Sequence, residues 1–386
     1  MRREHKILSS MTWLPAYVRH ALTDHRVAAQ RHLIIALADH FEPCYTGTPN
    51  VYHPVGEQVR RVRDWCARYP AAVDEWRDAD GQAFKHTYFY PAEHYHPEVL
   101  EVLAEFCRQG WGEIEIHLHH GVDRPDTSEN TRYMLETFRE QLVEHGCLSR
   151  FDRDSSPSYA FVHGNWALAN SANNRFCGVD DEMQILAETG CYADFTLPSA
   201  PDPSQIAKIN SIYECTLPMN RRAPHRRGRN LRVGAAPANP PIIVQGPLMV
   251  DLVRRPGRLL PRLENGDITS TNPGTLHRLK LWRDAGIIVE GRPEWCFIKL
   301  HCHGMIDRDE SAMLGALKTQ FVRDLVHAQN QGLQVHFVSA REMVNIIYAA
   351  CDGATGSPGE FRDYRLKLLT SAKPLGTLQS TTRPAE

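Results

Sequence analysis

The stretch HLIIALADHF, residues 32–41, decides how this chain folds. It is almost continuously apolar until Asp39 and His40, and it lacks the polar alternation of a strand that faces water on one side. Strands of parallel sheets, which helices cover on both faces, have this pattern. We therefore predict a buried parallel strand with two polar residues at its carboxyl end.

Strands of this kind alternate with helical segments along the rest of the chain. Further strands are predicted at 86–91, 113–121, 158–166, 191–199, 295–304 and 333–340. Helices are predicted at 55–70, 97–110, 130–146, 180–190, 275–286, 312–332 and 341–353. This order predicts an α/β fold with parallel strands.

The pattern also suggests how the chain is divided. Residues 1–30 are predicted to form a helical extension, and residues 31–350 a single α/β domain. Within it, residues 217–265 are rich in Pro, Gly and Arg and are expected to form a long excursion packed on the domain. Residues 351–386 are expected to be a loosely attached tail.

Composition excludes several functions. The formal net charge is −2 and the sequence pI is about 6.9. The overall charge therefore predicts no electrostatic attraction to nucleic acid or to an anionic membrane. No stretch reads as a signal peptide or a membrane span. The 10 cysteines form no CxxC pair, which is typical of reduced thiols, and we expect a cytoplasmic location. Nothing in the sequence indicates an oligomeric state.

The segment EIEIHLHHG, residues 113–121, predicts a metal site. Alternation places His117 and His119 on one face of the strand and Leu118 on the other. Two imidazoles at one strand end can converge on one ion. Zn²⁺ is the metal expected, because magnesium and calcium prefer oxygen ligands.

Other predicted strands also end in polar residues. Catalytic groups of parallel α/β folds lie at the carboxyl ends of strands. The ends here carry Asp39, His40, Glu42, His117, His119, His120, His163, Asn165, Trp166, Asp194, His301 and His303. Alternation points Cys302 away from His301 and His303, into the core.

The order of these motifs resembles that of the polysaccharide deacetylase family, whose catalytic domain is shared with chitooligosaccharide deacetylases. In that family an Asp pair ends the first strand and supplies the base and a metal ligand. The matching ALADHFEP places Asp39 at the base position and His40 at the ligand position. A later strand of the family ends in two ligand histidines, for which His117 and either His119 or His120 stand here.

The resemblance continues to about residue 350. FVHGNW resembles the motif that braces the base, with His163 in place of its Arg, and YADFTLPS resembles the fourth motif with Asp194. IKLHCHG resembles the Leu–His motif that supplies the acid, here His301. The resemblance implies a distorted (β/α) barrel with about seven parallel strands.

We therefore expect a metal-dependent hydrolase that removes an acyl group, N-acetyl in the first place, from a sugar-containing substrate. Asp39 and His301 would be catalytic, and His40, His117 and His119 would hold the metal, with His120, Asp39 or Glu42 as alternative ligands. The substrate would be bound by His163, Asn165, Trp166, Asp194 and His303, with the Trp166 ring stacking on a sugar.

Other functions fit the same sequence. One is a metal-dependent amidohydrolase acting on a small non-sugar amide. Another is a non-catalytic carbohydrate-binding barrel, which the histidine at position 40 in place of a ligand Asp favours. The arginines within 221–232 are interpreted either as a phosphate-docking segment or as a solvated loop.

Overall fold

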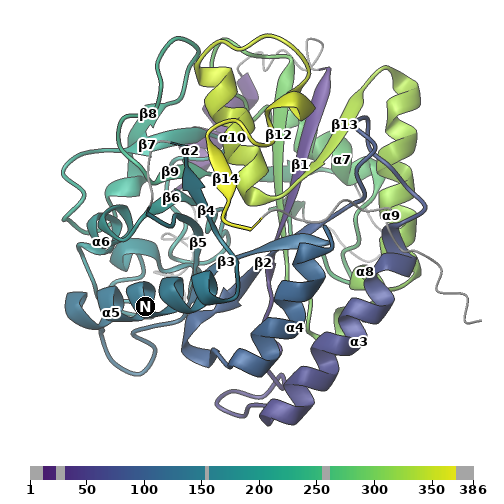
Figure 1. Ribbon diagram of the computed structural model, residues 1–386. Coiled ribbons are helices and arrows are strands. Elements are labelled where there is room, and N and C mark those ends of the chain that lie inside the picture. Colours follow the sequence, from purple (N-terminus) through teal and green to yellow (C-terminus); the bar gives the residue numbers. More distant parts are fainter. Residues whose placement is uncertain (1–11, 23–30, 153–155, 254–260, 371–386) are drawn as a thin grey trace, which may run out of the picture.

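The computed structural model describes residues 12–22, 31–152, 156–253 and 261–370 of the chain. It is a mixed α/β fold around a 10-stranded, mostly parallel sheet (Figure 1). The strand order is β12-β1-β2-β3-β5-β6-β9-β7-β8, and β13 pairs with the first half of β1. The sheet strands are β1 (His32–His40), β2 (His86–Pro91), β3 (Gly112–Leu118), β5 (Tyr159–His163), β6 (Cys191–Asp194), β7 (Ile212–Cys215), β8 (Gly228–Asn230), β9 (Ile242–Val244), β12 (Trp295–Cys302) and β13 (Gln334–Val338).

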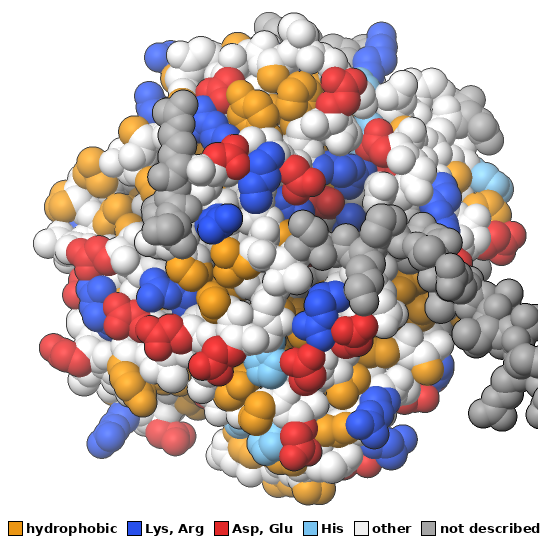
Figure 2. Space-filling view, in the orientation of Figure 1, with side chains coloured by type: hydrophobic (Ala, Val, Ile, Leu, Met, Phe, Trp, Pro, Cys, Tyr) orange, Lys and Arg blue, Asp and Glu red, His pale blue; other side chains and the backbone are white. Residues whose placement is uncertain are grey.

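Helices cover both faces of this sheet, which confirms the predicted α/β class. The helices are α2 (Leu14–Leu22), α3 (Val55–Val73), α4 (Pro97–Arg108), α5 (Ser128–Glu144), α6 (Glu182–Glu188), α7 (Leu276–Asp284), α8 (Glu310–Met313), α9 (Ala316–His327) and α10 (Ala340–Cys351). Figure 1 shows α3, α4 and α9 along one flank, and α10 on the other side of the strands. On the face seen in Figure 2, basic and acidic side chains are interspersed, as a net charge near zero leads one to expect.

Strand β1 shows why the central strands are apolar throughout. Leu33, Ile35 and Leu37 pack with the side chains of α3 and α4, on what we call the outer face of the sheet. Ile34, Ala36 and Ala38 pack on the inner face, against α10. The strand is buried on both faces, as its sequence predicts. Its last two residues, Asp39 and His40, must therefore lie on opposite faces.

The inner face is filled at one end by α10. All of its residues are buried, and a capping box of Ser339 and Glu342 fixes its first turn. Because α10 occupies the end of the inner face where the strands begin, only the carboxyl ends of the strands are left for a site.

The sheet does not close into a barrel by strand pairing within the described residues. β12 is an end strand, and its free edge is covered by loops. His301 N–H donates to the Gly266 carbonyl (3.0 Å), and the Lys299 ammonium donates to the carbonyls of Phe195 (2.7 Å) and Leu197 (2.5 Å). The Lys299 contacts join β12 to the segment after β6, and the His301 contact joins it to the loop around Gly266, without a ladder.

A buried ion pair holds the loop that covers this edge. The guanidinium of Arg278 donates twice to the Glu264 carboxylate (both 2.7 Å) and also to the Asp267 and Asn272 carbonyls (both 2.6 Å). Trp282 Nε1–H donates to the same carboxylate (3.0 Å). One pair thus fixes the loop beside His301.

The predicted divisions of the chain are found in part. Of the N-terminal extension, only α2 lies within the described residues. The excursion contributes β8 and β9 to the main sheet and forms a separate hairpin of β10 (Met249–Asp251) and β11 (Arg262–Glu264). Residues 254–260 lie outside the described residues.

The tail differs from the expectation as far as residue 370. β14 (Leu366–Leu368) pairs with β4 (Ser149–Phe151), and Leu366 is fully buried. The Asn345 side chain accepts from the backbone of Arg365 and Leu366, which sequence periodicity cannot reveal. Residues 371–386 lie outside the described residues.

None of the helices in the described part of the chain combines the length and apolar character that crossing a bilayer requires.

We predict that Glu264→Gln lowers the free energy of unfolding by about 3 kcal/mol, because the substitution leaves the Arg278 guanidinium buried without its counter-charge. Urea denaturation measures this loss. The matched variant Glu98→Gln, at an exposed position on α4, should change stability by less than about 0.5 kcal/mol. Equal stability of the two variants would show that the pair does not hold the loop.

Candidate metal centre

Glu42, His117 and His119 form a group that could hold a metal ion at the carboxyl ends of β1 and β3. We call these three residues the triad. Glu42 Oε1 lies 3.3 Å from His119 Nε2 and 3.7 Å from His117 Nε2. Their possible ligand atoms all lie within 4.8 Å of one another. Two imidazoles and one carboxylate are a set that binds Zn²⁺ and other divalent transition metals.

The remaining ring nitrogens fix the orientation of both histidines. His117 Nδ1–H donates to the Val162 carbonyl (2.8 Å), and His119 Nδ1–H donates to the Glu93 carboxylate (2.6 Å). Both Nε2 atoms are thereby turned towards Glu42. Metal-binding histidines are usually held through their other nitrogen in this way.

His117 Nε2 gives the clearest indication of a missing partner. The side chain is fully buried, yet among the described residues no hydrogen-bond partner reaches this nitrogen. A buried polar atom without a partner is costly, and a metal ion would supply the partner. The residues present therefore fit a metal.

The charge of the triad also suits a cation. Burial alone would raise the pKa of Glu42, but the neighbouring His117 and His119 imidazoles lower it to about 2. The Glu42 carboxylate is therefore ionised at neutral pH and available as a ligand.

Three more histidines surround the triad on the inner face. The His40 ring lies 4.7 Å, centre to centre, from the rings of both His117 and His303, and 6.5 Å from that of His301. Burial lowers the pKa of His40 and of His301 well below the usual value, and neighbouring imidazoles lower that of His40 further. These two histidines are therefore neutral at neutral pH.

The triad is reachable from solvent on one side. The His119 side chain is 26% exposed and that of Glu42 16%. Position 164 requires glycine, because a Cβ there would lie 2.3 Å from the His119 ring. The turn Gly164–Trp166 therefore lies against His119, with Asn165 exposed and Trp166 partly exposed.

Asp39, predicted as the base, lies on the outer face and not beside the triad. Its carboxylate accepts from His86 Nδ1–H (2.8 Å) and from the Gly304 amide (2.6 Å). His86 Nε2 in turn accepts from the buried Lys318 ammonium (2.7 Å). Asp39 and His40 are consecutive in a strand, so they cannot both face the metal centre.

The remaining predicted residues divide between the two faces. His301 and His303 lie near His40, and Cys302 lies with Asp39 and His86, as the alternation of β12 predicts. His163, expected beside Asp39, instead contacts His120 and Glu182 on the outer face. Asp194 is buried and accepts from the Thr196 hydroxyl (2.7 Å), without contact to the triad.

Sequence reasoning missed Glu93, Cys177 and Glu182. Glu93, in the short 3₁₀ helix η2 (Ala92–His94), directly follows the strand end at Pro91. The strand-end rule applied to 86–91 would have found it. Cys177 and Glu182 lie in a loop and at the start of a helix, where no periodic pattern marks them.

No protein-family model matches this chain, and no curated protein sequence matches it. The resemblance to polysaccharide deacetylases therefore stays a prediction from the motifs.

We predict that Asp39→Asn lowers stability by about 3 kcal/mol, because the amide cannot accept both hydrogen bonds and leaves the Lys318 charge uncompensated. Thermal and urea denaturation measure the loss, with the exposed Asp64→Asn as the control. Below its melting temperature the variant should match the wild type in metal content and in any hydrolytic turnover. A loss of about 100-fold in turnover with normal stability would instead restore Asp39 as the base.

Proposed function

We propose that this protein is a metal-dependent hydrolase that removes an acyl group, N-acetyl in the first place, from a sugar-containing substrate. The observation that carries the proposal is the buried, unpartnered Nε2 of His117, which points at the Glu42 carboxylate beside the second imidazole, that of His119. We also propose that the sheet, although strand pairing does not close it, has the architecture of a distorted (β/α) barrel. The site would lie at the carboxyl ends of its strands.

In this proposal Glu42, His117 and His119 hold a divalent ion, Zn²⁺ in the first place. His40, predicted as a ligand, becomes a neighbour of the metal. Such an ion polarises a carbonyl and makes a bound water more acidic. The ligand geometry is supported by the Val162 and Glu93 contacts that hold the two rings.

Proton transfer falls to the histidines around the triad. His40 is neutral and lies against His117, so its imidazole can accept the proton of an attacking water. His301 Nε2 lies 3.9 Å from the Asp267 carboxylate, which would stabilise the ring once protonated. We therefore assign His40, in place of Asp39, as the base that takes a proton from water. His301 is assigned as the acid for the leaving amine once it has taken a proton from solvent, and the proton held by His40 afterwards returns to solvent.

Aromatic side chains near the site support a sugar substrate. The Tyr52 ring is 49% exposed and packs against His94 (ring centres 4.3 Å apart), next to the Glu93 that holds His119. Trp166 is partly exposed beyond the turn that contacts His119. Exposed aromatic faces stack on the apolar faces of sugar rings, which favours a saccharide over a small non-sugar amide.

The cysteines support the predicted cytoplasmic location. None of the 10 is paired in a disulfide, as expected in a reducing compartment.

The proposal is tested with Glu42→Ala, which removes the only carboxylate of the triad. We expect acetate release from acetylated chitooligosaccharides to fall by at least about 100-fold, together with the loss of one metal ion per chain. Metal analysis of protein purified without added metal gives the second quantity. The control Glu57→Ala, at a partly exposed position on α3 where the carboxylate pairs with Arg60, should keep both.

Retention of full activity and full metal content in Glu42→Ala would contradict the proposed centre. A different result would favour the carbohydrate-binding or small-amide alternatives. It is a wild-type protein that binds metal but releases no acetate from any acetylated saccharide.

We predict that Trp166→Ala raises KM for an acetylated oligosaccharide about 5- to 10-fold and leaves kcat within about 2-fold, because stacking binds ground state and transition state alike. Steady-state kinetics measure both constants. Tyr133→Ala, at an exposed aromatic position on α5, should leave both unchanged. An unchanged KM in Trp166→Ala would remove this residue from the substrate site.

A further inference from the structure

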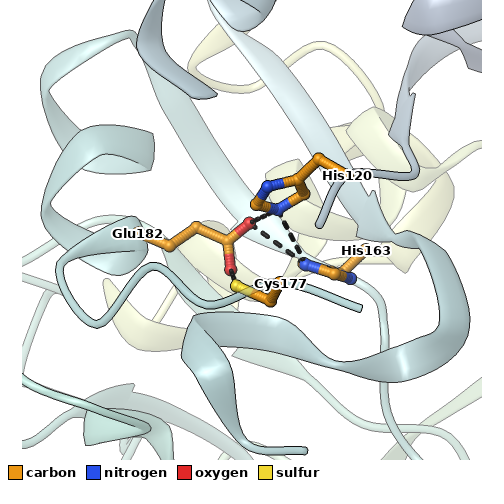
Figure 3. A group of neighbouring side chains, drawn as sticks. All are labelled: His120, His163, Cys177 and Glu182. Atoms are coloured by element: carbon orange, nitrogen blue, oxygen red, sulfur yellow. Dashed lines mark hydrogen bonds and ion pairs between the residues drawn. The ribbon is translucent and has the colours of Figure 1, made fainter. Parts of the chain in front are cut away.

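A second group of metal-ligating side chains lies on the outer face of the sheet. It consists of His120, His163, Cys177 and Glu182, drawn in Figure 3. They come from the segment after β3, the end of β5, the loop before α6 and the first residue of α6. All four are buried, and their possible ligand atoms lie within 4.8 Å of one another. Four separate parts of the chain thus converge on one point.

Both histidines direct the same nitrogen to that point. His120 Nδ1–H donates to the Asp126 carboxylate (2.9 Å), and His163 Nδ1–H donates to the Gly164 carbonyl. Asp126 is itself held by the Asn130 amide (2.8 Å). These acceptors carry no proton of their own, so the Nδ1 atoms are the donors, and the Nε2 atoms are left to face the point of convergence.

The inward atoms are acceptors that face one another. His120 Nε2 lies 3.0 Å from His163 Nε2, and Glu182 Oε1 lies 2.9 Å and 3.3 Å from these two nitrogens. Three acceptor atoms this close to one another need a cation among them, which is either a proton shared by His120 Nε2 and Glu182 or a metal ion. A buried site has no solvent to weaken the repulsion between these atoms.

The sulfur is arranged as a fourth ligand. Cys177 Sγ accepts from the amides of Asn170 (3.3 Å) and Val179 (3.4 Å), and it lies 3.6 Å from Glu182 Oε2. Backbone N–H donors stabilise a thiolate, the form in which cysteine binds metal. The Ala169 amide donates to Glu182 Oε2 (2.5 Å), which turns Oε1 towards the histidines.

We propose that His120, His163, Cys177 and Glu182 bind a structural Zn²⁺ ion. Two imidazoles, a thiolate and a carboxylate make a four-coordinate set of ligand types that zinc accepts. The two negative ligands balance the 2+ charge, so the buried site is neutral overall and its burial costs little. Because protein encloses all four residues, no position is open for substrate, as is typical of structural zinc sites.

The location of this zinc gives it a role in the fold. It joins the end of β3 to residues 164–181, where Asn165, Trp166, Ala169, Asn170, Asn173, Asn174 and Phe176 all have positive φ. Non-glycine residues at positive φ cost energy and persist only where surrounding contacts impose them. Gly121 lies so close to Cys177 that a Cβ would come within 2.0 Å of its carbonyl oxygen. The zinc would hold this strained loop against the strand that carries His117.

The site is independent of the proposed activity, and the test separates the two. Protein carrying Glu42→Ala, which lacks the triad carboxylate, is purified without added metal and analysed by elemental analysis and zinc-edge X-ray absorption. We expect one zinc ion per chain with a single sulfur neighbour at about 2.3 Å. The sulfur neighbour should be lost in Glu42→Ala/Cys177→Ser and kept in Glu42→Ala/Cys191→Ser, which alters another buried, free cysteine.

Stability provides a second readout. Removing the zinc from Glu42→Ala with EDTA should require partial unfolding and should lower the melting temperature by more than about 5 °C, because metal bound only by the folded state stabilises it. If Glu42→Ala/Cys177→Ser does not fold, the X-ray absorption spectrum of Glu42→Ala alone tests the proposal. A zinc coordination shell without sulfur in that spectrum would overturn it.

Two further results would overturn it. One is a folded Glu42→Ala protein with no bound metal and a melting temperature unaffected by EDTA, which would mean that a proton shared by His120 and Glu182 replaces the ion. The other is a sulfur shell that survives Cys177→Ser. A protein that releases no acetate but retains this zinc would bear only on the proposed function of the triad and would support the outer zinc site.

Discussion

A strand that is buried on both faces cannot leave a polar side chain without a partner, and this constraint organises the whole chain. At the carboxyl ends of the central strands the side chains change from apolar to ionisable, but the alternation between faces continues. Each ionisable group must therefore be satisfied on whichever face it reaches. Asp39, Cys302 and His163 reach the outer face, and His40, His117 and His301 reach the inner one.

The two faces satisfy these groups by different means because helices cover them differently. On the outer face, α3 and α9 close over Asp39, and the chain from Lys318 through His86 to the carboxylate meets every requirement within the protein. On the inner face, α10 fills only the end where the strands begin. The carboxyl end stays accessible at His119 and Glu42, which is why a proposed reaction centre belongs there and not beside Asp39.

The periodicity of the sequence predicts the fold class and the faces of the strands, whereas motif matching predicts few of the residues that meet in one site. The α/β class, the order of strands and helices, and the opposite directions of Cys302 and His301 follow from apolar patterns of period two and 3.6. Matching ALADHFEP to an Asp pair, in contrast, assigned Asp39 and His40 to one site although the strand separates them. Alternation alone would have favoured His40 with a residue two positions later, which is Glu42.

Contacts between distant parts of the chain were beyond such reasoning. The Glu182 carboxylate meets His120 across 62 residues, and Asn345 binds the backbone of a segment expected to be a loose tail. Neither residue lies in a pattern that sets it apart from a solvated neighbour. The free edge of β12 is likewise covered through contacts of Lys299 and of the Arg278–Glu264 pair. Sequence reasoning would have assigned these charged side chains to the protein surface.

If both proposed metals are bound, a single physical reason explains why three histidines stand so close together in EIEIHLHHG. His117 and His119 share one face and serve the triad, whereas the chain leaves the strand after Leu118, and His120 turns to the outer face. Two ions held from adjacent residues would fix this short segment from both sides of the sheet. A reaction centre works only if its ligands are held to within a fraction of an ångström. The closed outer site would thus provide the rigidity that the open inner site, exposed at Glu42 and His119, lacks by itself.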